Sequence, residues 1–210
     1  MISKILDKIA GGAKVDDTEK KILEKELEKI LSAPPQPDLR VIGLFSDVSD
    51  DKIAELIHAL IYLDEINRIT EEDRPVEFYI STYGGSADDM FGMYDIMRVI
   101  RERTPIQTIG LGKVMSAGVL LLAAGTKGKR CIGKNCRVMV HSVIGGSHGP
   151  LHNLINEMDA IEQIQKMYSD ALIAETNMTK KDLKKLLEKK VNVYLSAEEA
   201  VELGIADIII

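Results

Sequence analysis

The sequence predicts one α/β domain in which strands and helices alternate. Short runs rich in β-branched residues recur along the chain, and the segments between them carry apolar residues at helical spacing. At 210 residues, 45% of them hydrophobic, the chain is long enough to bury a sizeable core. From residue 40 onward we expect, in order, strand 40–45, helix 50–68, strand 76–81, helix 86–103, strand 106–111, helix 116–124 and strand 137–141.

Three later segments are predicted to be helical. Two short helices begin at Thr179 and Ser196, each of which has an acidic residue three positions later, as in a helix cap, and Gly204 closes the second. Before them, residues 150–175 form a long amphipathic helix. Its apolar stripe comprises Leu151, Leu154, Ile155, Met158, Ile161, Ile164, Tyr168 and Leu172.

The first part of the chain has a different composition. Residues 1–31 read as an added helix, with Asp16 and Glu19 in a capping arrangement and apolar residues on one face. The proline-rich segment 32–37 then breaks this helix with an extended linker. We therefore expect an N-terminal helical extension and linker over residues 1–38, and one folded domain over residues 39–210.

The sulfur-containing residues are interpreted as core. In helix 86–103 the methionines recur at helical spacing, which is more typical of a buried face than of a recognition surface. Cys131 and Cys136 cannot frame a disulfide-rich fold, and two thiols near His141 without a second cysteine pair do not predict zinc. We expect buried free thiols in adjoining strands, and no metal or cofactor.

Composition and charge exclude several classes of function. A net charge of −6 with mixed signs along the chain lacks the basic clustering of a nucleic-acid-binding protein. The longest apolar run, residues 114–124, is shorter than the roughly 20 residues that cross a bilayer. Charges within the first turns also argue against a secretory signal. We expect a soluble cytoplasmic protein that binds neither nucleic acid nor membrane.

Residues of types that often take part in catalysis follow three of the predicted strands. Gly84 and Gly85 follow the second strand, Ser116 stands where the third strand turns into a helix, and His141 ends the fourth. The carboxyl ends of strands in an open α/β sheet converge on one crevice. A lone serine at this place is most often an N-cap. Here a nucleophile, backbone N–H donors and an imidazole are expected to meet.

These residues resemble the proteolytic subunit of the Clp protease, a self-compartmentalising serine peptidase. Besides the glycine pair and the serine before an apolar helix, residues 124–130 read Ala-Gly-Thr-Lys-Gly-Lys-Arg and residues 137–141 read Arg-Val-Met-Val-His. Residues 194–200 and 204–207 are similar to the C-terminal signature of that family. The resemblance covers about residues 40–210. It implies a spiral of βαβ repeats of the Clp protease and crotonase type, with a long handle helix.

The resemblance also implies roles for individual residues. Ser116 corresponds to the nucleophile and His141 to the general base, while the N–H groups of Gly85 and Ala117 correspond to the oxyanion hole. The position of the catalytic acid is held by Asn192. Its amide oxygen can orient an imidazole but supplies no negative charge, so activity is reduced, rescued by another carboxylate, or lost.

The partners that the resemblance implies are polypeptide substrates, copies of the chain in two stacked rings of seven, and an AAA+ unfoldase. In a ring assembly the helix 150–175 would be the handle through which two rings stack. Two departures argue against docking of the usual ATPase. The N-terminal extension replaces the axial loop of the family, and Glu77 replaces one of two strand tyrosines, of which Tyr79 is kept.

Three hypotheses of function follow. The first is a compartmentalised serine endopeptidase, favoured by Ser116 and His141 in their context. The second is an inactive structural ring subunit, suggested by Asn192. The third is an acyl-CoA enzyme of the crotonase type, which shares the fold and the oxyanion hole but does not need the serine and histidine pair.

Overall fold

The computed structural model describes residues 21–22, 25, 39–187 and 192–210. Residues Arg40–Ile210 form one compact unit. Apart from residues 21, 22 and 25, which are helical, the predicted N-terminal helix and its proline-rich linker lie outside the described residues. The predicted α/β fold class is confirmed by the described unit, which combines a largely parallel sheet with several helices.

In the described part of the chain, seven strands form one sheet with the order β1-β2-β3-β4-β7, and β5 pairs with both β3 and β6. Every pairing is parallel except that of β5 with β6. The strands are β1 Val41–Leu44, β2 Val76–Thr82, β3 Ile106–Met115, β4 Cys131–Ile132, β5 Arg137–Val140, β6 Val193–Leu195 and β7 Ile208–Ile209.

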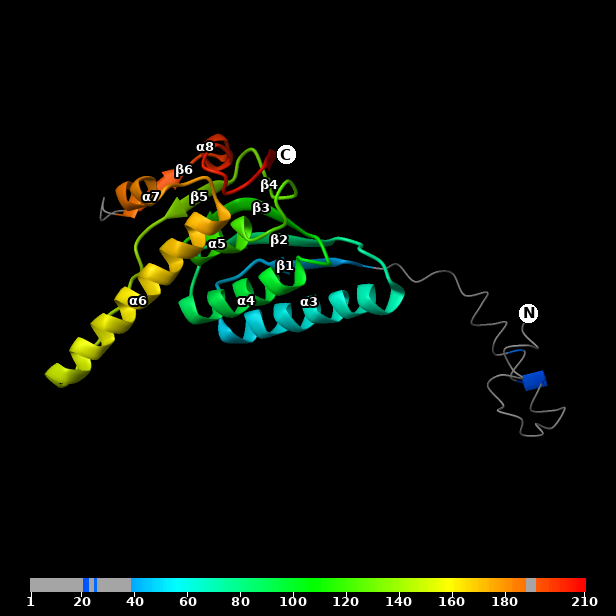
Figure 1. Ribbon diagram of the computed structural model, residues 1–210, viewed down its shortest axis with the longest axis horizontal. Coiled ribbons are helices and arrows are strands. Elements are labelled where there is room, and N and C mark those ends of the chain that lie inside the picture. Colours follow the sequence, from blue (N-terminus) through cyan, green and yellow to red (C-terminus); the bar gives the residue numbers. More distant parts are fainter. Residues whose placement is uncertain (1–20, 23–24, 26–38, 188–191) are drawn as a thin grey trace. The chain divides into compact units, whose positions relative to one another are not determined.

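Helices lie in the connections between consecutive strands except between β4 and β5, which do not pair with each other. Figure 1 shows α3 and α4 side by side along one face of the sheet, below β1 and β2. The described helices of this unit are α3 Asp50–Thr70, α4 Ala87–Ile100, α5 Ala117–Ala123, α6 Leu151–Glu175, α7 Lys180–Leu187 and α8 Ala197–Glu202. The predicted cap of α8 is present, because Ser196 and Glu199 form a reciprocal capping box.

The third predicted strand is longer than the sequence indicated. β3 continues through Met115 because its second half pairs with β5, whereas its first half pairs with β4, and β2 pairs with both halves along the other edge. Gly112, with φ of +65°, lies at the change of partner and adopts a conformation that favours glycine. The extension matters for the site, since it carries the chain to the residue immediately before Ser116.

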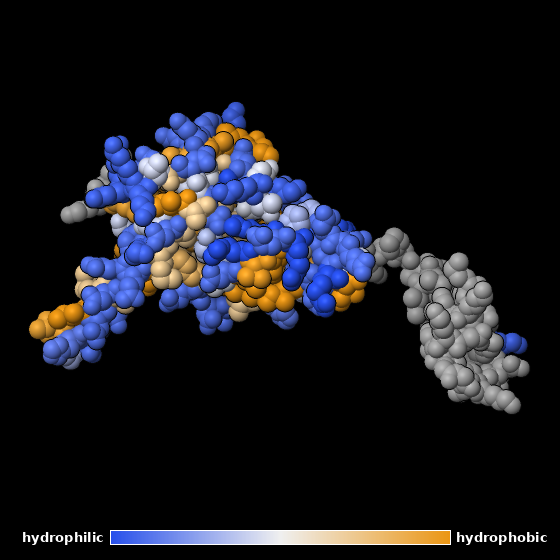
Figure 2. Space-filling model, viewed as in Figure 1, coloured by the Kyte–Doolittle hydropathy of each residue, from blue (hydrophilic) through white to orange (hydrophobic). Residues whose placement is uncertain are grey.

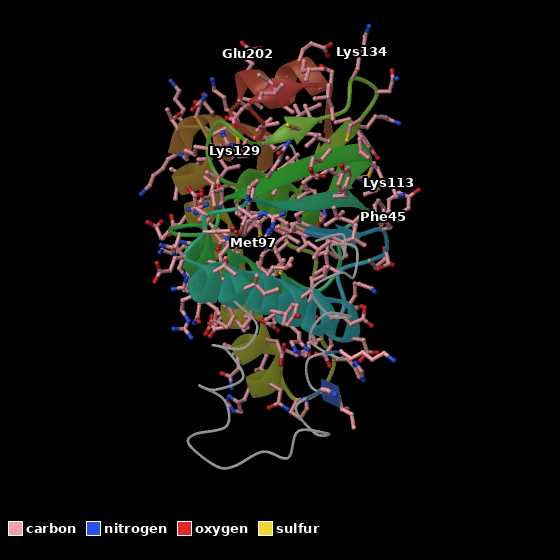
Figure 3. All side chains as sticks on the ribbon, turned by 90° about the vertical axis from the view of Figure 1, so that its right-hand side faces the viewer. Phe45, Met97, Lys113, Lys129, Lys134 and Glu202 are labelled. Atoms are coloured by element: carbon pink, nitrogen blue, oxygen red, sulfur yellow. The ribbon has the colours of Figure 1, made fainter. Side chains whose placement is uncertain are left out.

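The hydrophobic core lies between the sheet and its helices. Met90, Met93 and Met97 are almost fully buried, which confirms that the methionine face of α4 is core, and Figure 3 places Met97 in the layer between helix and sheet. Every residue of α5 is buried. Cys131 and Cys136 are buried free thiols, as expected, although Cys136 lies one residue before β5 rather than in a strand.

Helix α6 is buried over one part of its length and exposed over another. Tyr168 and Leu172 near its C-terminal end are buried in the core, whereas Leu151, Ile155 and Met158 near its N-terminal end are exposed. Figure 1 shows this end extending beyond the rest of the domain, and Figure 2 shows hydrophobic surface there. The C-terminal half of the predicted apolar stripe is thus buried, and its N-terminal half is exposed in a single copy of the chain.

Candidate active site

The parallel register of three strands brings the predicted site residues to one edge of the sheet. Thr82 at the end of β2 pairs with Val114, and Met115 at the end of β3 pairs with Met139 of β5. Ser116 directly follows β3, His141 directly follows β5, and the glycine pair follows β2 after one residue. Because parallel strands end at the same edge, the three connections open into one crevice.

Ser116 has a strained backbone. Its φ is +53° and its ψ is −122°, a region that side-chain-bearing residues rarely adopt. The Ser116 N–H donates to the carbonyl oxygen of Met139 at 2.8 Å, and the Ser116 carbonyl oxygen accepts from the Tyr168 hydroxyl at 3.0 Å and from the Val119 N–H at 3.0 Å. The Ser116 hydroxyl does not cap α5. The strained turn therefore presents the hydroxyl to the crevice without using it to start the helix.

The glycine pair allows the backbone after β2 to approach Ser116 closely. A Cβ atom on Gly84, which has φ of +104°, would lie 2.6 Å from the Cβ of Ser116. A Cβ atom on Gly85 would lie 2.1 Å from the carbonyl oxygen of Val48. Val48 holds this loop from the other side, because its N–H donates to the Gly84 carbonyl at 2.8 Å and its carbonyl accepts from Ser86 at 2.9 Å.

Two backbone N–H groups remain available at the crevice. Ala117 is the first residue of α5, where a helix leaves its N–H without an intrahelical acceptor. Gly84 and Ser86, on either side of Gly85, make the two hydrogen bonds to Val48, and the N–H of Gly85 takes part in neither. Among the described residues, no backbone carbonyl of a loop, turn or helix cap accepts a hydrogen bond from the Gly85 or the Ala117 N–H. They are suited to meet a negative oxygen.

A cavity of about 390 Å³ occupies the crevice. Gly85, Ser116, Ala117 and His141 all line it, so the structure brings together four of the five predicted site residues. The described lining contains no carboxylate, and burial raises the pKa of the Tyr168 hydroxyl. The other lining residues are Tyr83, Ser86, Ala87, Met90, Val143, Ile144, Ile164 and Tyr168.

His141 is oriented by its own neighbour in the chain. Its Nδ1 atom lies 2.5 Å from the carbonyl oxygen of Ser142, which can accept a hydrogen from Nδ1 and leave Nε2 as the proton acceptor. No hydrogen bond joins His141 to Ser116 or to Asn192, all three of which are described. Hydrogen bonds between catalytic groups are often long in a free enzyme and shorten when substrate binds.

The structure places Asn192 outside the cavity lining. Asn192 is exposed and directly precedes β6. Val193 pairs with Val140, so the same antiparallel register continued by one residue puts Asn192 opposite His141. Asn192 therefore follows the strand pair at the same end as His141, and no hydrogen bond joins the two side chains.

Sequence reasoning missed three residues that support the site. Tyr168 was assigned only to an apolar stripe, although a buried tyrosine normally finds a partner for its hydroxyl, and that rule could have marked it. Ser142 and Gln165 carried no such signal. The contact of Ser142 with His141 depends on the conformation of the loop after β5, and that of Gln165 with Val143 depends on how this loop meets α6. His58, His148 and His152 are exposed.

A metal-ligand cluster and a membrane-spanning helix each place requirements on the described residues. Within them, no cluster of three His, Cys, Asp or Glu side chains could hold a metal ion. None of their helices combines the length and apolar character that crossing a bilayer requires.

The fold and the crevice define an α/β domain with a serine at a strained strand-to-helix turn, an imidazole and two backbone N–H groups on one cavity. The chain belongs to the Clp protease family, because the family model described as Clp protease matches residues 36–210.

Curated relatives agree with this assignment. The ATP-dependent Clp protease proteolytic subunit 2 of Corynebacterium jeikeium (strain K411) is 32% identical over 169 residues, covering 80% of this chain and 77% of that protein. The proteolytic subunit 1 of Corynebacterium glutamicum is 31% identical with the same coverage. The proteolytic subunit 1 of Prochlorococcus marinus subsp. pastoris is 27% identical over 210 residues, covering 100% of this chain and 96% of that protein.

Proposed function

We propose that this chain is a serine endopeptidase that cleaves unfolded polypeptides or peptides through an acyl-enzyme. The observation that carries the proposal is the strained backbone of Ser116 beside His141 on one cavity, since strain of this kind persists only where the surrounding structure enforces it. Family membership supports a peptidase over the acyl-CoA hypothesis, because the relatives are named as protease subunits.

The proposed reaction uses the groups that line the cavity. The Ser116 hydroxyl attacks the carbonyl carbon of the substrate while His141 Nε2 takes its proton. The carbonyl oxygen becomes negative and accepts hydrogen bonds from the N–H groups of Gly85 and Ala117. His141 then gives its proton to the leaving amine, the C–N bond breaks, and a water molecule activated by His141 hydrolyses the ester to free Ser116.

In this proposal, no carboxylate holds the position of the catalytic acid beside His141. The neutral Ser142 carbonyl can hold the hydrogen on Nδ1 of His141, and Asn192 adjoins Val193, which pairs with Val140. Neither residue supplies a negative charge to stabilise the imidazolium. We therefore expect turnover below that of a site with a carboxylate, which lowers the barrier further.

The assembly and its partners belong to the same proposal. The exposed apolar side chains Leu151, Ile155 and Met158 on α6 support a homo-oligomer, which we propose to be two stacked rings of seven. We expect the usual AAA+ unfoldase to dock poorly, because Tyr79 donates its hydroxyl to Glu77 on the strand that would receive it. A cytoplasmic location completes the proposal.

A second candidate is an inactive ring subunit that pairs with an active paralogue. It is favoured by one observation, the lack of any carboxylate among the described residues that line the cavity.

Peptide hydrolysis separates the two candidates. The purified full chain is incubated with an unfolded protein and with fluorogenic peptides that carry an apolar residue before the cleaved bond, and Ser116→Ala serves as the control. Hydrolysis that the substitution removes supports the peptidase. If the parent releases no more product than Ser116→Ala, the hypothesis of an inactive ring subunit is supported instead.

A further inference from the structure

The hydroxyl of Tyr168 reaches the strained turn from α6. It donates to the Ser116 carbonyl oxygen at 3.0 Å, and the tyrosine is only 4% exposed. Without this bond the Ser116 carbonyl would keep a single donor, the Val119 N–H. A residue with positive φ is held only when several contacts fix it, so loss of one contact lets the turn relax.

One helical turn earlier, Gln165 contacts the loop that follows the imidazole. Its Oε1 accepts from the Val143 N–H at 2.7 Å, two residues after His141. Its Nε2 donates to the Ser169 hydroxyl at 3.1 Å, which fixes the orientation of the amide. The peptide that joins Ser142 to Val143 is therefore held on its N–H side by Gln165, while its carbonyl faces His141 Nδ1.

We propose that Tyr168 and Gln165 are positioning residues, which hold the nucleophile and the base in their relative places from one face of α6. Residues three apart lie on the same face of a helix. Tyr168 fixes the turn of Ser116, and Gln165 fixes the carbonyl that orients His141. The inference deepens the proposed peptidase site and rests on it.

The geometry explains why one helix serves both groups. Ser116 follows β3 and His141 follows β5, so each comes from a different connection. A displacement of about 1 Å between reacting groups can cost on the order of 100-fold in rate. A rigid helix in contact with both connections limits that displacement, which neither connection could do alone.

Tyr168→Phe tests the nucleophile half, because it removes the hydroxyl and keeps the ring that lines the cavity. The matched control is Tyr94→Phe, since Tyr94 is also buried but donates to Glu175 away from Ser116. Three experiments are done on the full chain. They measure the rate of labelling by a fluorophosphonate probe, kcat and KM for a small peptide, and the hydrogen exchange of residues 115–120.

For Tyr168→Phe we expect labelling and kcat to fall about tenfold or more, KM to change less than about twofold, and exchange of residues 115–120 to rise. Tyr94→Phe should match the parent in all of these. Equal exchange and equal labelling in Tyr168→Phe and the parent would overturn the inference. A parent that the probe does not label overturns the proposed function instead, and the exchange measurement still decides whether Tyr168 holds the turn.

Gln165 is tested by a pair of variants. Gln165→Met removes the acceptor for the Val143 N–H at similar size, whereas Gln165→Glu keeps an acceptor at the same place. We expect Gln165→Met to lose about tenfold in kcat with a displaced acidic limb of its pH profile, and Gln165→Glu to restore most of the rate. A Gln165→Met enzyme with the parental rate and profile, or a Gln165→Glu enzyme equally impaired, would exclude the role for Gln165.

Discussion

His141 Nδ1 and the carbonyl oxygen of Ser142 lie 2.5 Å apart, so the imidazole is oriented by a neutral group from its own loop. Val140 pairs with Val193, the residues next to His141 and Asn192, and no hydrogen bond joins the His141 and Asn192 side chains. The proposed site therefore has a defined tautomer without a neighbouring negative charge. In serine peptidases of the chymotrypsin type, changing the aspartate to asparagine lowers kcat about 10⁴-fold, partly because the tautomer is wrong.

Asn192→Asp should raise kcat for a small peptide. The new carboxylate would lie across from the imidazole and stabilise the cation that forms during attack. Because the Ser142 carbonyl already favours the tautomer with hydrogen on Nδ1 of His141, we expect kcat to rise about 10-fold, far below 10⁴. Steady-state kinetics of the two proteins under identical conditions give the answer. A variant no faster than the parent would contradict the explanation that turnover is limited by the lack of a negative charge near His141.

Gly84→Ala should damage the site through geometry alone. The added Cβ would lie 2.6 Å from the Cβ of Ser116 at a positive φ. Strain of this kind costs about 1–3 kcal/mol and displaces the turn, so the rate of fluorophosphonate labelling should fall at least about tenfold. Labelling at the parental rate would show that the close approach of Gly84 to Ser116 does not shape the site.

Gly92→Ala is the matched control and should stabilise the protein. Gly92 lies in the interior of α4, and the nearest atom to its added Cβ would be Ile57 Cδ1 at 3.9 Å. Alanine favours the helix over glycine by up to about 1 kcal/mol. Urea unfolding should move to higher concentration while labelling of Ser116 is unchanged. A loss of stability would mean that α4 packs more tightly at Gly92 than the structure indicates.

Glu175 should make stability depend on pH in the acid range. Burial alone would raise the pKa of its carboxyl, but hydrogen bonds from Arg101 and Tyr94 outweigh burial and hold the pKa below its ordinary value. The stabilisation is thus fully present above the ordinary carboxyl pKa of about 4.3, and is lost as the pH falls through the lower pKa of the folded state.

Glu175→Gln should remove about 3 kcal/mol of unfolding free energy at pH 7, because Arg101 loses a largely buried partner. As the pH falls through the lowered pKa of Glu175 in the folded state, the variant and the parent should converge. Urea unfolding at several pH values measures both effects. Asp170→Asn, which breaks an exposed pair with Lys166, is the control and should leave the midpoint unchanged. A constant difference between parent and Glu175→Gln at every pH would exclude the ion pair as its cause.

The long elements of the fold could be predicted from the sequence because their patterns extend over many residues. The methionine face of α4 and the stripe of α6 each repeat over several turns, and β2 alternates between buried and half-buried positions throughout. The strands β4, β6 and β7 have two or three residues each, which is too short for any alternation to be recognised. They form because neighbouring strands offer them free hydrogen-bonding groups.

The site was predictable to the extent that it lies at strand ends. Ser116, His141 and the glycine pair follow consecutive strands along the sheet, so parallel topology alone brings them together. The contacts of Tyr168 and Gln165 could not be predicted in this way. They depend on the angle at which α6 crosses the loops, and that angle is set by packing between segments distant in the chain.

The most direct test of the account is the reaction of the purified protein with a fluorophosphonate probe, followed by peptide mapping of the modified residue. We expect one modified site, Ser116, with no labelling in Ser116→Ala and a rate at least about 100-fold lower in His141→Ala, since a nucleophile and its base act as a unit. Modification at another residue, or a His141→Ala variant that reacts as fast as the parent, would contradict the assignment of Ser116 and His141 as a catalytic pair.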